Sequence, residues 1–149
     1  MRKKWNLFLL VLVVPFFLGA CGSVTGPKTG LDVVASIGQQ TAESVTFRIG
    51  IENTGSETRT LSFSSAQFCE IEVKSLFGKM VWNFAHDATF ATMVWELEVA
   101  PGETKVRELV WDLTGNDQKP VPSGVYKARI VITGGSRDEV LSTEIGLTI

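Results

Sequence analysis

Histidine and cysteine are scarce in this chain of 149 residues, which has one of the first and two of the second. Metal centres need several such ligands at paired spacings, and no such pair occurs in this sequence. The lone His86 stands beside Asp87, without a nucleophile-elbow motif in the sequence. A triad completed by a distant serine stays open, because such triads are spatial. We predict a solvated histidine, no metal, no cofactor and no enzymatic activity.

Long runs of one charge are also absent. The chain has 14 basic and 16 acidic residues, a net charge of −2. No block of five like charges occurs, and no basic patch is interleaved with aromatic residues. Nucleic acid is therefore excluded as a predicted partner.

No apolar run is long enough to span a bilayer. The longest, residues 7–18, holds about a dozen residues and is interrupted by Pro15, whereas a spanning helix needs about 20. It follows a basic start at residues 2–4 and ends in small residues. This order is typical of a secretory signal peptide, predicted over residues 1–20.

The run ends in Leu18-Gly19-Ala20-Cys21, which resembles the lipobox of bacterial lipoproteins. The resemblance implies cleavage before Cys21 and a diacylglyceryl group on its thiol. Residues 21–30, rich in Gly, Ser and Thr, then form a flexible tether of roughly 15–18 Å. A chain acylated more than once stays on its membrane. We expect a domain at 31–149, lipid-anchored to a bacterial membrane outside the cytoplasm.

Apolar residues alternate with polar ones along most of the remaining chain, as in strands with one buried face. The pattern is clear at residues 45–51, 69–73, 95–99 and 126–132, with Pro and Gly turns between them. About eight or nine short strands at this spacing predict an all-β fold, an antiparallel β-sandwich of immunoglobulin-like type. No convincing helix follows the signal.

Some positions leave alternatives open. Residues 85–93 are a loop or a single helical turn. Residues 104–113 place apolar side chains on both faces, which either a bulge or burial on both sides would reconcile. We expect the strand tryptophans to pack in the core, with Trp111 the least settled. Cys69 begins an alternating run, and we expect it to be buried.

Several pieces, in order, resemble the BsuPI domain. They include Ser-Ser-x-Gln at residues 64–67, Gly-Lys-x-x-Trp at 78–82, Pro-Gly-Glu at 101–103 and Pro-x-Gly-x-Tyr at 122–126. The resemblance covers roughly residues 43–133. It implies an immunoglobulin-like sandwich that binds and inhibits a protease.

Two departures from the family stand out. Cys69 occupies a position where the family tends to an aromatic residue, which alters packing. The name-giving inhibitor acts inside the cell, whereas this signal directs the domain outside, so the protease target differs. No inhibitory residue carries over from the family.

An inhibitory loop must be rigid and exposed, because pre-organisation lowers the ordering cost of binding. Residues 114–123 are the first candidate: Pro120 and Pro122 stiffen the loop, and Lys119 suits an acidic specificity pocket. The alternative is a solvated connector. Phe90 is a second possible anchor. A different class of function is a passive assembly module that adds a partner's strand at a sheet edge.

Overall fold

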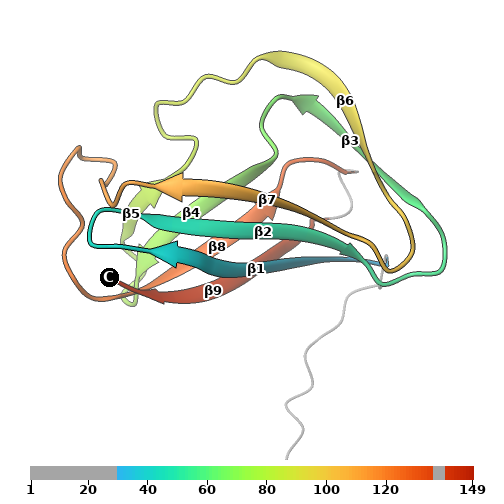
Figure 1. The fold of residues 1–149 in the computed structure, drawn as a ribbon. Helices are drawn as coiled ribbons and strands as arrows, with labels where there is room; N and C mark the ends of the chain where they lie inside the picture. Colours follow the sequence, from blue (N-terminus) through green and yellow to red (C-terminus); the bar gives the residue numbers. More distant parts are fainter. Residues whose placement is uncertain (1–29, 136–139) are drawn as a thin grey trace, which may run out of the picture.

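A computed structural model describes residues 30–135 and 140–149. The predicted signal peptide, Cys21 and all of the tether except Gly30 lie outside them. Within the described part of the chain no helix is long and apolar enough to cross a membrane. The regular structure of these two ranges is nine strands, so the all-β prediction is confirmed (Figure 1). The strands are β1 (Leu31–Gln40), β2 (Val45–Asn53), β3 (Arg59–Ser65), β4 (Cys69–Ser75), β5 (Met80–Asn83), β6 (Thr92–Val99), β7 (Thr104–Trp111), β8 (Val125–Ile132) and β9 (Ser142–Thr148).

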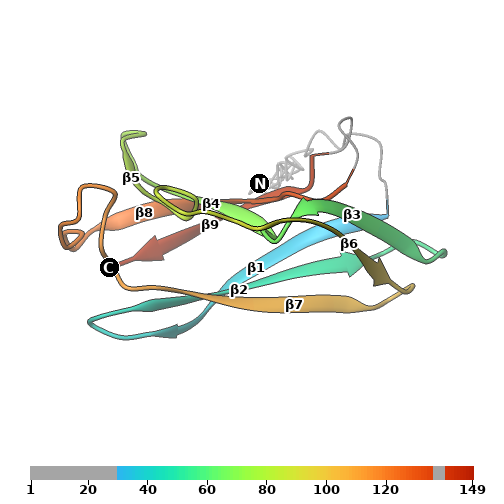
Figure 2. The same cartoon turned by 90° about the horizontal axis from the view of Figure 1, so that it is seen from above.

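The strands form three antiparallel sheets, ordered β1-β2-β7, β3-β6 and β5-β4-β8-β9. Figure 2 shows the first and last as two layers. The β3–β6 pair lies at one end, where the chain passes from β3 into β4 of one layer and from β6 into β7 of the other. The arrangement is a β-sandwich, compatible with the immunoglobulin-like type.

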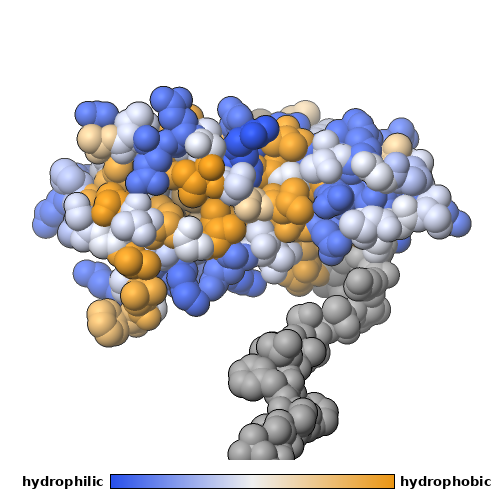
Figure 3. All heavy atoms as spheres, turned by 60° about the horizontal axis from the view of Figure 1, so that its bottom comes forward, coloured by the Kyte–Doolittle hydropathy of each residue, from blue (hydrophilic) through white to orange (hydrophobic). Residues whose placement is uncertain are grey.

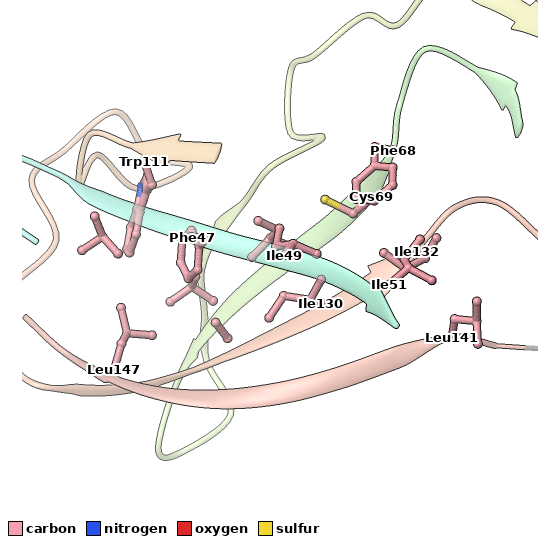
Figure 4. Close-up of a cluster of buried hydrophobic side chains, with 14 of the residues drawn as sticks. Phe47, Ile49, Ile51, Phe68, Cys69, Trp111, Ile130, Ile132, Leu141 and Leu147 are labelled. Atoms are coloured by element: carbon pink, nitrogen blue, oxygen red, sulfur yellow. The ribbon is translucent and has the colours of Figure 1, made fainter. Parts of the chain in front are cut away.

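The core lies between the two layers. Phe47, Ile49 and Ile51 of β2 face Ile130 and Ile132 of β8 (Figure 4), and all five are at most 4% exposed. They are alternate residues of their strands, since successive side chains point to opposite faces. Burial of each such side chain contributes about 1.5–3 kcal/mol.

Strand β7 resolves the conflict seen in the sequence. Its register with β2 is unbroken, so no bulge is present. Trp111 is buried, while Val106 and Val110 point outward and are 48% and 64% exposed. Neither a bulge nor burial on both sides therefore explains the apolar residues of this strand. The strand has one inward face and carries two valines on its solvent-facing side. The prediction that Trp111 packs in the core is confirmed.

The strands run between two ends of the sandwich. Leu31 pairs with Asn53 at one end. At the other end, here called the distal end, the Gln40 side chain donates to the Thr148 carbonyl, and Tyr126 pairs with Ser75. The ten residues of β1 separate the ends by about 30 Å. The distal end therefore gathers the β4–β5 and β7–β8 connections (Figure 1).

Candidate functional site

The distal end carries a tight hairpin at residues 75–79, here called the Phe77 hairpin. Ser75 N–H donates to the Lys79 carbonyl, and Gly78 N–H donates to the Ser75 carbonyl, both at 2.9 Å. Gly78 has a φ of +80°. A turn closed by a left-handed residue is a common three-residue hairpin connection, and glycine adopts that conformation without strain.

The β7–β8 connection contains a second hairpin with the same pattern, residues 115–119, here called the Lys119 hairpin. Gly115 N–H donates to the Lys119 carbonyl at 2.8 Å, and Gln118 N–H donates to the Gly115 carbonyl at 3.0 Å. Gln118 takes the left-handed position with a φ of +59°. Both loops are thus closed by backbone hydrogen bonds.

The two hairpins differ in what their loop residues contact. In the Lys119 hairpin, Asn116 is held against β5: its N–H donates to the Val81 carbonyl at 3.0 Å, and its Oδ1 accepts from Asn83 N–H at 2.9 Å. The apex residue of that hairpin, Asp117, is exposed and acidic. Phe77, at the other apex, is 99% exposed, and the adjacent Leu76 is 59% exposed. Figure 3 shows an apolar projection at its lower left, where this hairpin leaves the body.

The outer face beside the Phe77 hairpin carries paired charges. Lys74 and Arg129 approach Glu72 at 2.8 and 3.9 Å, and Lys127 bonds Glu144 at 2.8 Å. The hydrogen bond that Lys127 donates to the Glu144 carboxylate raises the pKa of Lys127. These residues line a hollow of about 230 Å³ under Leu76. Opposite charges are interspersed there.

Lys119, Pro120 and Pro122, singled out in the sequence, lie at the distal end and are exposed. Lys119 follows the apex of its hairpin, and its N–H donates to Asp117 Oδ1 at 3.2 Å. Pro120 forms a bridge with Thr114, and the Pro122 carbonyl accepts the Tyr126 hydroxyl at 2.7 Å. The loop is ordered, as an inhibitory loop requires, and the role of Lys119 stays a prediction.

Phe90 lies in the connection between β5 and β6. This connection contains turns, with His86 N–H bonded to the Asn83 carbonyl and Ala88 N–H to the Ala85 carbonyl, so the loop alternative is correct. Phe90 is half-buried, its ring tilted against Phe84 with centroids 5.7 Å apart. As an anchor it is less available than Phe77.

His86 and Cys69 were the two side chains with possible chemistry. His86 is exposed and contacts Asp87 at 3.3 Å. It borders a polar hollow of about 180 Å³ between β5 and the Lys119 hairpin. Cys69 is 2% exposed, as predicted. Burial raises the pKa of its thiol to about 12, with Glu70 adding to the rise and Arg107 opposing it. A thiol with this pKa is inert at neutral pH.

Among the described residues, no group of three or more His, Cys, Asp and Glu side chains could hold a metal ion. The residue that sequence reasoning missed is Phe77. A signal was present: turns favour Gly, Pro, Asn, Asp and Ser, yet the apolar pair Leu76-Phe77 directly precedes Gly78.

Solved structures that match this chain share little sequence with it. A β-glucosidase from Kluyveromyces marxianus is 14% identical over 80% of this chain and 14% of its own, with a TM-score of 0.44. A CARDB domain from Pyrococcus furiosus is 13% identical over 79% of this chain and 85% of its own, with a TM-score of 0.40. This chain spans only a small part of the glucosidase, and these likenesses carry no functional argument.

No curated protein sequence matches the chain. The model of one protein family does, and its description is BsuPI, intracellular proteinase inhibitor. The match extends over residues 33–137, from early in β1 to the connection that follows β8. It contains both distal hairpins. The chain therefore belongs to the BsuPI family of proteinase inhibitors.

Proposed function

We propose that this protein is a lipid-anchored inhibitor that binds a proteinase outside the cytoplasm. The family match over residues 33–137 carries the inhibitory part of this proposal. The signal-like residues 1–20 and the lipobox ending at Cys21 support the anchored, extracytoplasmic part. The two together separate this chain from an inhibitor that acts inside the cell.

The geometry of the distal end supports the proposal. A tether that begins at Cys21 enters the sandwich at Leu31, and both hairpins lie at the opposite end, about 30 Å away. A domain held in this way presents its ordered hairpins away from the lipid. Hairpins closed by backbone hydrogen bonds lose little conformational freedom on binding, which favours affinity.

The inhibitory activity is tested by titration. The lipidated chain in mild detergent micelles is added to extracellular serine proteinases at fixed substrate concentration. We expect stoichiometric inhibition of at least one proteinase, with the inhibitor recovered uncleaved. Ordinary turnover of the chain by every proteinase in the panel would contradict the proposal.

The anchor is tested separately with Cys21→Ser in a bacterial host. We expect the wild-type protein in the membrane fraction and the variant outside it, because only a thiol accepts the diacylglyceryl group. Mass spectrometry of the mature wild-type protein should find acyl chains on its first residue. Equal membrane retention of both proteins would contradict lipidation.

The alternative is a non-inhibitory assembly module. Its supporting observation is β6, which pairs with β3 and carries the exposed Met93 and Val94, 46% and 82% exposed. An exposed strand of this kind suits strand addition by a partner. Crosslinking from position 94 in intact membranes, together with no inhibition, would favour this second function.

A further inference from the structure

We propose that Phe77 is the anchor of the inhibitor, inserted into the apolar specificity pocket of its target proteinase. This inference rests on the proposed function and deepens it, since it names the class of proteinase bound. The proposal predicts a proteinase whose specificity pocket accepts a large apolar side chain. An acidic pocket, as Lys119 would require, belongs to a different class of proteinase.

The first argument is the exposure of Phe77. Its side chain is 99% exposed, whereas every other phenylalanine in the described residues is buried or half-buried: Phe47, Phe63, Phe68, Phe84 and Phe90. An aromatic side chain on a hairpin apex contributes nothing to the core. Aromatic residues dominate the energetics of many interfaces once a pocket of the partner encloses them.

The second argument is that the hairpin holds Phe77 outward. Two backbone hydrogen bonds close it, and the Ser75 hydroxyl additionally accepts from Lys79 N–H at 3.3 Å. Gly78 supplies the left-handed residue, and a Cβ there would meet no atom within 4 Å. The hairpin thus projects into open solvent in a conformation set by its own hydrogen bonds. An apex of this kind enters a concave site without refolding.

The third argument is the contrast with the Lys119 hairpin. It has the same closing hydrogen bonds, but Asn116, the first residue of its loop, is bonded to Val81 and Asn83 of β5, and its apex residue is the acidic Asp117. That hairpin is fastened to the body, and Lys119 lies beyond its apex. Of two similar loops at one end of the sandwich, only the Phe77 hairpin presents an unattached apolar apex.

A lipid surface is the competing occupant for an exposed Leu76-Phe77 pair. Insertion into anionic lipid is favoured when basic residues flank the apolar side chains. The hairpin itself carries one basic residue, Lys79, and on the face beside it Lys74 and Lys127 are each engaged by a glutamate at 2.8 Å. The hairpin also lies at the end opposite Leu31, where the tether enters. Both observations favour a proteinase.

The test measures inhibition constants for the lipidated full chain against chymotrypsin and subtilisin, which have apolar pockets, and trypsin, which has an acidic one. Phe77→Ala should weaken inhibition of the first two by about 30-fold or more, the effect of a strong interface anchor. Phe77→Leu should retain most of it. Val106→Ala removes an exposed apolar side chain from the outer face of β7 and should leave inhibition unchanged. Phe77→Lys should transfer inhibition to trypsin, a gain that misfolding cannot produce.

The outcomes separate this inference from the proposed function. No inhibition by the wild-type chain would contradict both. Wild-type inhibition that Phe77→Ala leaves unchanged, or that Lys119→Ala alone abolishes, would overturn the assignment of Phe77 and keep the inhibitor. Binding of the Cys21→Ser chain to phosphatidylglycerol vesicles that is lost with Phe77→Ala, while inhibition persists, would assign the hairpin to lipid and also overturn it.

Discussion

The indole rings of Trp82 and Trp111 stack on each other, with centroids 4.9 Å apart and planes 19° from parallel. Trp82 belongs to β5 in one layer and Trp111 to β7 in the other, so the stack joins the two sheets. Trp111 Nε1–H also donates to the Thr114 carbonyl at 2.8 Å, at the start of the connection that holds the Lys119 hairpin. This pair therefore supports the distal end from inside.

Replacement of Trp111 should be among the most damaging changes to stability. Trp111→Ala removes a side chain that is 1% exposed and leaves the Thr114 carbonyl without its indole donor. We expect a loss of about 3–5 kcal/mol in the free energy of unfolding, measured by urea denaturation. Trp82 is only half-buried, and Trp82→Ala should cost less. Equal costs would contradict the packing described here.

Asn53 is a buried polar residue whose side chain is fully bonded. Its Nδ2 donates to the carbonyls of Val99 and Glu57, at 2.7 and 2.8 Å, and its Oδ1 accepts from Gly55 N–H at 3.0 Å. Asn53→Ala removes all three hydrogen bonds, although Gly55 N–H keeps a second acceptor, the Gly30 carbonyl at 3.3 Å. We expect a loss of about 2–4 kcal/mol in the free energy of unfolding, measured by urea denaturation.

Asn53→Asp separates hydrogen bonding from size. A carboxylate cannot donate to the Val99 carbonyl, whereas a protonated carboxyl can, so folding should raise the pKa of the new side chain. The variant should then gain stability relative to wild type as pH falls from 7 to 4. A difference between the two proteins that does not depend on pH would contradict the role given to Asn53 as donor.

Two glycines form a matched pair for a packing test. A Cβ on Gly134 would lie 2.6 Å from the ring of Phe63, which cannot retreat because Trp95 stacks on it at 4.0 Å. Gly134→Ala should therefore cost about 1–3 kcal/mol in the free energy of unfolding. Gly146→Ala meets no atom within 4 Å and lies inside β9. It should be neutral or stabilise by about 0.5–1 kcal/mol. Thermal unfolding of both variants tests the prediction.

The Cys69 thiol should resist modification in the folded protein. Its pKa is raised from 9.0 to about 12, chiefly by burial. At pH 8 we expect a thiol reagent such as DTNB to react slowly with the native Cys21→Ser chain and at once in denaturant. Rapid modification of the native protein would contradict the burial of Cys69.

The same pKa shift predicts a loss of stability in alkali. The unfolded thiol releases its proton near pH 9 and the folded one only near pH 12, so the contribution of Cys69 is full below pH 9 and falls between these values. The decline should reach about 1.4 kcal/mol per pH unit. Cys69→Ala serves as the control. It removes the part of the alkaline loss of stability that comes from the Cys69 thiol and leaves the part that comes from other titrating groups.

Alternation in the sequence was enough to predict the strands and the inward face of most of them. Phe47, Ile49 and Ile51 could be assigned to the core because a strand turns successive side chains to opposite sides. The glycine turns between strands could be predicted because a tight turn often needs a residue in the left-handed conformation. The same local rules allowed Cys69 to be placed inside, and the ordered motifs already indicated the BsuPI family.

Local rules could not predict which side chains the two packed sheets would bury and which they would leave exposed. The outward valines of β7, the bonds that fasten Asn116 to β5 and the stacking of Trp82 on Trp111 depend on residues distant in sequence. The exposure of Phe77 was decided in the same way. A turn pattern specifies the path of the backbone, but whether an apex side chain meets protein or water depends on which strands the fold brings beside it.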